Sequence, residues 1–327
     1  MSGRAPSAFP RRPGSPALRF LLVFAGACAL AIGLVVGGVA ALHRRGLLPA
    51  PAVTATWCFN AKFAFLRDAP LRDRTLVAIG SSVTWRNLDM AVFEQRLPGS
   101  RALNAAPCFL HIDQTAFLAS FLLRRLPRLE TLVVALAPRD YENCAPASTA
   151  FFDPKLAGAF VDGTVPGWMV HLLGFRPVWL LREAVRQHRT GGRGASGALD
   201  DPLGSSILRR PGAYWPPPLF DAHCDPWLAR LEAMAAERGV RLVVATVPTM
   251  PAWAAEFDPD GTLVERWTRH LAASLRRPET VFADGSALRW PDTHFADPVH
   301  LLFPHHQAFS HYIADAIEAR HGPRDGG

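Results

Sequence analysis

The sequence lacks several patterns that define large classes of protein. It contains no Walker-type phosphate loop, which argues against a P-loop nucleotide hydrolase. It contains no internal repeat, which argues against solenoids and propellers. It also has no Cys-x-x-Cys pair, so the spacing of its cysteines does not indicate a zinc site.

Acidic residues are missing from the first 45 positions, although the same stretch holds six arginines: Arg4, Arg11, Arg12, Arg19, Arg44 and Arg45. The whole chain has 35 Lys and Arg against 28 Asp and Glu, a formal net charge of +7. The remainder of the chain is therefore close to neutral. A basic protein often binds nucleic acid, but this charge flanks an apolar run, so we expect no nucleic-acid partner.

No charged residue interrupts the run from Phe20 to Leu42. About 20 apolar residues cross a hydrocarbon core, whereas the apolar region of a signal peptide has about 7–15. We therefore predict an uncleaved transmembrane helix over residues 20–42. Four arginines precede the run and two follow it, which places the N-terminus in the cytoplasm.

This topology gives the predicted domain organisation. Residues 1–19 form a disordered cytoplasmic tail, residues 43–56 a linker, and residues 57–321 a folded domain on the periplasmic or extracytoplasmic side of a bacterial inner membrane. Residues 322–327 form a second disordered tail. Four cysteines lie in the part predicted to be outside, and an oxidising compartment would allow one or two disulfides with three possible full pairings. They are Cys58, Cys108, Cys144 and Cys224.

Short apolar segments alternate with helix-like segments through the predicted domain. The predicted strands cover residues 76–79, 100–104, 132–137, 241–247 and 280–283, and the predicted helices cover residues 88–97, 114–123, 226–238 and 304–320. This alternation indicates an α/β fold with a parallel sheet and helices on both faces. The pattern breaks in an insertion at about residues 142–225, where residues 190–206 are rich in Gly and Ser and expected to be flexible. The insertion is either a helical addition packed on the domain or a lid that faces substrate.

Gly80-Ser81-Ser82 follows the first predicted strand directly. Ligands of open α/β sheets bind beyond the carboxyl ends of the strands, so a serine on this turn is a candidate nucleophile. Backbone N–H groups of the turn and helix start could hold an oxyanion. The alternative is that Ser82 only caps a helix. Far along the chain, Asp297 and His300 supply an Asp-x-x-His pattern that could activate a serine.

These motifs together resemble the SGNH (GDSL-like) hydrolase superfamily, over roughly residues 75–317. Gly80-Ser81-Ser82 stands at the family's Gly-Asp-Ser, and Asp297 and His300 at its Asp-x-x-His. The resemblance implies a three-layer sandwich with a flavodoxin-like strand order. It also implies Ser82 as the nucleophile, with Ser81 as the second choice, His300 as the base and Asp297 as the residue that orients it.

Arg86-Asn87-Leu88-Asp89 resembles a motif of the membrane-anchored bacterial branch, whose members work in alginate O-acetylation and teichoic-acid alanylation. That branch also suggests a second base, because Asp292-Thr293-His294-Phe295 resembles the Asp-x-His-Trp pattern of the alginate proteins. We prefer His300 to His294 because the segment after His300 matches the commoner pattern. We expect the neighbouring His305 and His306 to be surface residues rather than metal ligands.

The oxyanion-binding positions depart from the family pattern. The second family block lacks its Gly and reads Asn104-Ala105-Ala106-Pro107-Cys108, and Arg139 replaces the Asn of the third. Cys108 and Arg139 are therefore the candidates for oxyanion or substrate contacts. A guanidinium can stabilise an anion but differs from an amide in reach. The alternative is that Arg139 forms a structural pair with Asp140.

Two functions are consistent with the sequence. The first is a membrane-anchored serine esterase or O-acyltransferase that acts on acyl esters, acetyl in the first instance, of an envelope or exported polysaccharide. It needs no cofactor or metal, and its expected partners are the membrane, an acylated envelope polymer and a membrane O-acyltransferase. The second is a catalytically silent SGNH-like component that binds polysaccharide or scaffolds an export machine.

Overall fold

The computed structural model describes residues 16–145, 150–189, 201–212 and 216–321. The chain divides into two compact units, residues 1–48 and 49–327. The first unit contains helix α1 (Pro16–Arg44), which is 29 residues long and apolar enough to cross a membrane. This helix includes the whole of the transmembrane segment predicted over residues 20–42. Residues 16–19, expected in the tail, are helical because Pro16 is well suited to the first position of a helix. The predictions for residues 1–15 and 322–327 lie outside the described residues.

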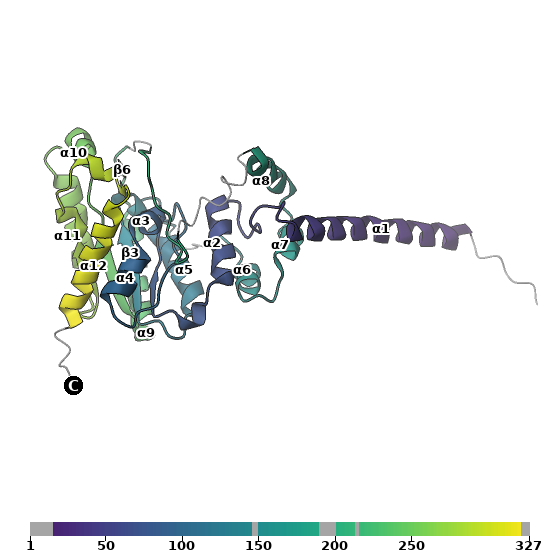
Figure 1. Cartoon of the computed structure of the whole chain (residues 1–327), viewed down its shortest axis with the longest axis horizontal. Helices are drawn as coiled ribbons and strands as arrows, with labels where there is room; N and C mark the ends of the chain where they lie inside the picture. The colour runs from purple at the N-terminus through teal and green to yellow at the C-terminus, as the bar shows by residue number, and fades with distance from the viewer. Residues whose placement is uncertain (1–15, 146–149, 190–200, 213–215, 322–327) are drawn as a thin grey trace, which may run out of the picture. The chain divides into compact units, whose positions relative to one another are not determined.

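The second unit is built on a five-stranded parallel sheet in the order β2-β1-β3-β4-β5, which confirms the predicted α/β class (Figure 1). The strands are β1 (Leu76–Ala78), β2 (Ala102–Asn104), β3 (Thr131–Leu136), β4 (Arg241–Thr246) and β5 (Val281–Asp284). Leu76 on β1 pairs with Ala102 on β2 and with Thr131 on β3. The carboxyl ends of all five strands therefore lie along one edge.

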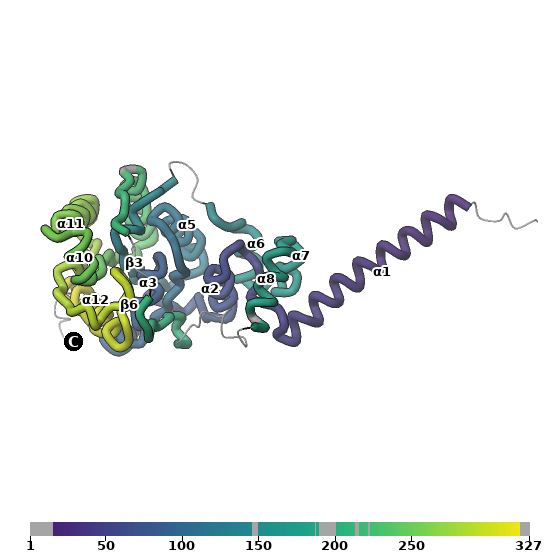
Figure 2. Tube along the Cα trace, turned by 90° about the horizontal axis from the view of Figure 1, so that it is seen from above, coloured from purple at the N-terminus to yellow at the C-terminus, as the bar shows by residue number. Residues whose placement is uncertain are grey.

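Both faces of the sheet are buried, as the continuous apolar strands require. Leu132, Val134 and Leu136 point into one core, and Val133 and Ala135 point into the other. The first core includes side chains of α2 (Trp57–Asp68), α5 (Ile112–Leu123), α9 (Asp225–Glu237) and α11 (Thr262–Ser274). The second includes side chains of α4 (Met90–Arg96) and α12 (His305–His321). In Figure 2, α5 and α12 are seen on opposite sides of β3.

The first helix after β1 differs from its prediction over residues 88–97. It is two helices, α3 (Ser82–Asn87) and α4, because Leu88 and Asp89 leave the helical conformation. The Asp89 carboxylate then caps α4 by accepting a hydrogen bond from the Ala91 N–H at 3.0 Å. A short helix α10 (Pro251–Phe257), which has no counterpart among the predictions, follows β4.

The predicted linker also differs, because much of it is packed into the second unit. Ala52, Val53 and Thr54 are buried. The buried Asn60 holds this segment with both ends of its side-chain amide: its Oδ1 accepts from the Thr54 N–H at 2.8 Å and its Nδ2 donates to the Thr54 carbonyl at 3.0 Å. An apolar segment fixed by a buried amide is part of the domain.

The insertion contains α6 (Pro154–Val161), α7 (Gly167–Leu173) and α8 (Pro177–Arg189). The prediction of a flexible segment over residues 190–206 is wrong at its end, since Gly204, Ser205 and Ser206 are buried. Residues 190–200 lie outside the described residues. The disulfide Cys144–Cys224 joins the two ends of the insertion, and Cys58–Cys108 joins α2 to the loop after β2. This is one of the three possible full pairings.

Candidate active site

The turn after β1 places Ser82 at the carboxyl edge of the sheet. Gly80 has a φ of +142°, and an added Cβ would overlap the Thr84 side chain, so only glycine fits there. The Thr84 hydroxyl donates to the Ala135 carbonyl at 2.8 Å and accepts from the Ala135 N–H at 3.0 Å, which ties the turn to β3. Ser81, not Ser82, caps α3, because its Oγ accepts from the Val83 N–H. Ser82 begins α3 with a half-buried side chain.

The structure brings Ser82, His300 and Asp297 together in one hydrogen-bonded chain. His300 Nε2 lies 3.0 Å from Ser82 Oγ, and His300 Nδ1 lies 2.7 Å from Asp297 Oδ2. An ionised carboxylate can only accept, so Nδ1 carries the proton and Nε2 is left to accept the Ser82 hydroxyl proton. This is the arrangement of nucleophile, general base and orienting acid that activates a serine.

A tight hairpin holds Asp297 and His300. Strands β6 (Phe295–Asp297) and β7 (His300–Leu301) are antiparallel, and Asp297 pairs with His300 across the turn. Asp297 Oδ1 also accepts from the backbone N–H groups of Val299 and His300 at 3.1 and 3.0 Å. Burial by itself would raise the pKa of the Asp297 carboxyl. The hydrogen bonds and charge of His300, with the two backbone amides, outweigh it and hold that pKa below its usual value. Asp297 is therefore ionised when His300 needs a partner.

Asn87 connects this hairpin to the helix that carries Ser82. Its Nδ2 donates to the Val299 carbonyl at 2.7 Å, and its Oδ1 accepts from the Leu301 N–H at 2.8 Å. The two contacts flank His300 on either side. Asp89 connects the same segment to α12, since its N–H donates to Ser310 Oγ and its carboxylate accepts from Gln307 Nε2. The Arg86–Asp89 motif was found in the sequence as a resemblance, but this clamping role was not.

Asp292 and His294, the alternative acid and base from the sequence, make their contacts with other residues. Asp292 Oδ1 accepts from the Ala252 N–H at 2.8 Å, and the His294 ring stacks on His305 with centroids 3.5 Å apart. The pKa of His294 is lowered by burial and by the charge of His305. The imidazole that meets Ser82 is that of His300. The structure thus joins the preferred residues, whereas Asp292 and His294 contact other partners.

His306 corrects a prediction, because it is buried rather than at the surface. Its Nε2 lies 3.8 Å from Asp89 Oδ2. Burial lowers the pKa of its ring, and the charge of Asp89 opposes that effect. His305 is half-buried under His294. Among the described residues, no group of three or more His, Cys, Asp and Glu side chains is arranged to hold a metal ion.

The block that contains Cys108, a predicted oxyanion or substrate contact, makes its hydrogen bonds and its disulfide within the fold. Cys108 is buried in its disulfide, so its thiol is not available. In the same block the Ala105 N–H donates to the Ala78 carbonyl at 2.8 Å and the Ala106 N–H to Asn104 Oδ1 at 3.1 Å. Pro107 has no N–H. Two backbone N–H groups of this block are therefore engaged within the fold.

Arg139 pairs with Glu142 rather than with Asp140. Its Nε lies 3.1 Å from Glu142 Oε1, and its side chain is 37% exposed. Asp140 is buried and accepts from the Ala137 N–H at 2.9 Å. Burial raises the pKa of the Asp140 carboxyl to about 7, against the opposing effect of the hydrogen bonds from Ala137 and Ser81.

A buried lysine, which the sequence did not predict as important, joins the end of β2 to the segment around Gly204. Lys62 Nζ donates to the carbonyls of Asn104 and Gly204 at 2.9 and 2.7 Å. Trp85, on the Ser82 helix, also donates to the Gly204 carbonyl. Burial lowers the pKa of Lys62 well below its ordinary value, although the charge of Asp201 opposes this. No motif marks this lysine, because its partners are backbone atoms of distant segments.

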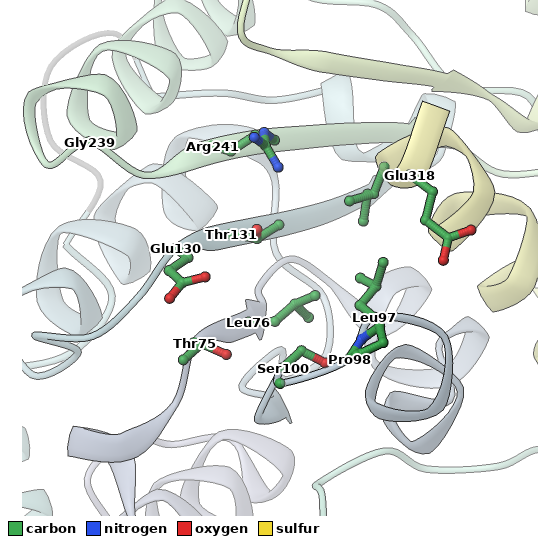
Figure 3. A pocket seen from close by; sticks show the side chains of 12 residues that line it. Thr75, Leu76, Leu97, Pro98, Ser100, Glu130, Thr131, Gly239, Arg241 and Glu318 are labelled. Carbon is green, nitrogen blue, oxygen red and sulfur yellow. The ribbon is translucent and has the colours of Figure 1, made fainter. Parts of the chain in front are cut away.

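Two cavities differ in their relation to the triad. One of about 620 Å³ lies at the amino ends of the strands, lined among others by Thr75, Thr131 and Arg241 (Figure 3). It is at the opposite edge from Ser82. A much smaller one of about 20 Å³ lies at the carboxyl edge. Its lining is mostly apolar. The residues come from the loops after β3 and β4, from the insertion and from the turn between Asp297 and His300: Pro138, Arg139, Pro216, Pro218, Thr249, Trp253, Pro298 and Val299.

No protein-family model and no curated protein matches this chain.

Proposed function

We propose that this protein is a membrane-anchored serine esterase or O-acyltransferase of the SGNH type. Its substrates would be acyl esters of an envelope or exported polysaccharide, and acetyl is the acyl group that we expect. The observation that carries the proposal is the chain of hydrogen bonds from Ser82 through His300 to Asp297. The strand order and the burial of both sheet faces support a flavodoxin-like three-layer sandwich.

The chemistry follows from the positions of the three groups. Ser82 Oγ attacks the acyl carbonyl carbon while His300 Nε2 takes the hydroxyl proton, and Asp297 stabilises the resulting imidazolium. His300 then returns the proton to the departing sugar oxygen, which leaves an acyl-Ser82 ester. Water or a second sugar hydroxyl attacks this ester and loses its proton to His300. The bond between the acyl carbon and Ser82 Oγ then breaks as His300 returns that proton to Oγ, which regenerates the free serine. Arg139, half-exposed at the carboxyl edge, is our candidate to bind the oxyanion or an anionic polymer.

The proposed location is the bacterial inner membrane, with the second unit on the periplasmic side. Helix α1 and its arginine flanks support it, and two disulfides are expected in an oxidising compartment. The acylated polymer and a membrane O-acyltransferase are the proposed partners.

A fluorophosphonate probe tests the activity directly. The full-length protein in detergent should react at Ser82, as identified by peptide mass spectrometry, and Ser82→Ala should remove the labelling. Heat-denatured protein should not react, which controls for non-specific acylation. A folded wild type that remains unlabelled contradicts the enzyme proposal.

One observation favours a second function, a catalytically silent scaffold that binds polysaccharide. The Ala105 and Ala106 amides, where the SGNH family has an oxyanion donor, are engaged within the fold. Loss of one such donor typically costs about 10²–10³ in rate. Polysaccharide binding by an unlabelled but folded protein would be the signature of this alternative.

A further inference from the structure

Helix α8 has an inner and an outer face of different character. On the inner face, the Arg186 guanidinium lies 5.6 Å from the Trp57 ring, and Arg186 Nε donates to Glu183 at 3.0 Å. On the outer face, Val178, Leu181 and Val185 are 67, 67 and 42% exposed. Their spacing of three and four residues places them in one apolar stripe along the helix. A stripe of this kind normally faces a core.

The exposed apolar surface continues into the turn before the helix. Leu173 is 59% exposed and Phe175 is 77% exposed. Phe175 has a φ of +29°, a conformation that is rare for a bulky residue. Backbone strain that keeps an aromatic ring in solvent suggests that the ring has a partner. We define the α8 patch as Leu173, Phe175, Val178, Leu181 and Val185.

The exposed charged residues of α8 and of the turn before it are of one sign. Arg176, Arg182 and Arg189 are exposed beside it. The one acidic residue of α8 is Glu183, which is half-buried and paired with Arg186. Apolar side chains flanked by arginines are typical of helices that lie in the surface of an anionic bilayer.

The length of the intervening chain limits how far this patch can lie from Arg44. A Cβ added at Gly174, inside the patch, would lie 3.1 Å from the Ala52 carbonyl oxygen, so the turn packs on Ala52. Ala52 is only about eight residues beyond Arg44, where α1 ends, and a chain of that length spans at most about 28 Å. A turn tethered in this way can reach the surface of a bilayer that α1 crosses.

We propose that the α8 patch inserts into the headgroup region of a bilayer that contains anionic phospholipid. The stripe would enter the boundary with the acyl chains, about 5–10 Å deep, and the arginines would contact phosphates. A second copy of the chain fits less well, because two copies paired through this face would bring their arginines together. The proposal depends on the membrane insertion of α1 but not on the chemistry of Ser82.

The test uses an environment-sensitive fluorophore on single cysteines in the full-length protein, reconstituted in nanodiscs with phosphatidylglycerol. Leu181→Cys reports on the patch, and Glu237→Cys, exposed at the end of α9, is the matched control; both carry Cys28→Ser. The native Cys28 labelled alone is the positive control for insertion. Lipids that carry a doxyl group near the top of the acyl chain serve as the quencher.

The expected result is strong quenching and a blue-shifted emission at positions 28 and 181, with neither at position 237. Equal, weak quenching at 181 and 237 would overturn the proposal. A blue shift at 181 without lipid quenching would also overturn it, because the patch would then be covered by protein. Absence of quenching at Cys28 would remove the insertion on which the proposal depends. A protein that fails to react with fluorophosphonate can still pass this test, so the two proposals fail separately.

Discussion

At the scale of single residues, the site depends on which hydrogen bonds each polar atom has already made. Asp297 uses one carboxylate oxygen for backbone amides and the other for His300, so the imidazole has one orientation and one free nitrogen. That nitrogen meets Ser82 Oγ. His294, a few residues away in the sequence, is instead engaged by His305. Identical side chains so close in sequence therefore have different chemical capacities.

We expect His300→Ala to abolish fluorophosphonate labelling and turnover, while His294→Ala keeps a substantial fraction of both. Members of a triad act as a unit, so loss of the base should lower kcat by about 10⁴-fold or more. Initial labelling rates of the two purified variants provide the comparison. The reverse ranking would transfer the role of base to the Asp292 and His294 pair.

Asp140 gives a pH-dependent prediction about stability. Its carboxyl has a pKa of about 7 in the folded protein against an ordinary value of 3.8, so the native state holds an additional proton between these values. The contribution of this group to stability is full below pH 4 and is lost as the pH rises through 7. Asp140→Asn, whose Oδ1 can still accept the Ala137 N–H, should therefore raise the Tm at pH 7.5 and change it little at pH 4.

Thermal unfolding followed by tryptophan fluorescence in one detergent at both pH values measures this effect. The decisive quantity is the difference in Tm between variant and wild type, since other groups also titrate over the range. A difference that stays constant with pH would show that Asp140 is ionised in the folded protein.

At the scale of elements, the Ser82 helix and the His300 hairpin are held together by one amide side chain. Asn87 contacts the backbone on both sides of His300. Because α3 and the hairpin are separated by more than two hundred residues, their register depends on such contacts. Asn87 is the last residue of α3, and the chain leaves the helical conformation directly after it, at Leu88.

Asn87→Ala should lower kcat more than it raises KM, because it displaces His300 without removing a substrate contact. It leaves the Leu301 N–H and Val299 carbonyl without their partner, which typically costs about 1–3 kcal/mol of stability for each buried group. Gln95→Ala, at an exposed position on α4, is the matched control and should leave kcat, KM and stability unchanged. The labelling rate, corrected for the folded fraction, distinguishes positioning from simple unfolding. A corrected rate equal to that of wild type would exclude the positioning role.

At the scale of the whole molecule, two disulfides and one apolar helix indicate the compartment in which the site would work. Cys144–Cys224 closes the base of the insertion, and Cys58–Cys108 fixes the segment beside β2. Both stabilise the domain chiefly by restricting the unfolded chain. Such a domain is suited to an oxidising compartment, which agrees with the topology that we propose from the arginine flanks of α1.

The topology predicts the behaviour of reporter fusions. Alkaline phosphatase fused after Arg320 should be active in a Gram-negative host, because it folds only where its own disulfides form. A fluorescent reporter that matures only in the cytoplasm, fused at the same position, should be dark. The opposite pair of results would reverse the orientation.

The sequence by itself determined the parallel α/β class and the apolar helix. Buried parallel strands are short continuous apolar runs and membrane spans are long ones, and local composition reveals both. It also brought Ser82, Asp297 and His300 forward as a group, since the resemblance links motifs that are distant along the chain. Only the tertiary structure decided which histidine meets the serine. His294 and His300 lie too close in sequence for their different surroundings to be read from composition.

Other features were decided by contacts between segments that have no local signature. The pairing of Cys108 with Cys58, the ion pair of Arg139 with Glu142 and the burial of Lys62 all depend on which backbone atoms reach the same place after folding. Gly204 appeared in a stretch whose composition is typical of flexible loops, yet its carbonyl is fixed by Lys62 and Trp85. Buried polar groups need partners, and the fold supplies those partners from distant parts of the chain.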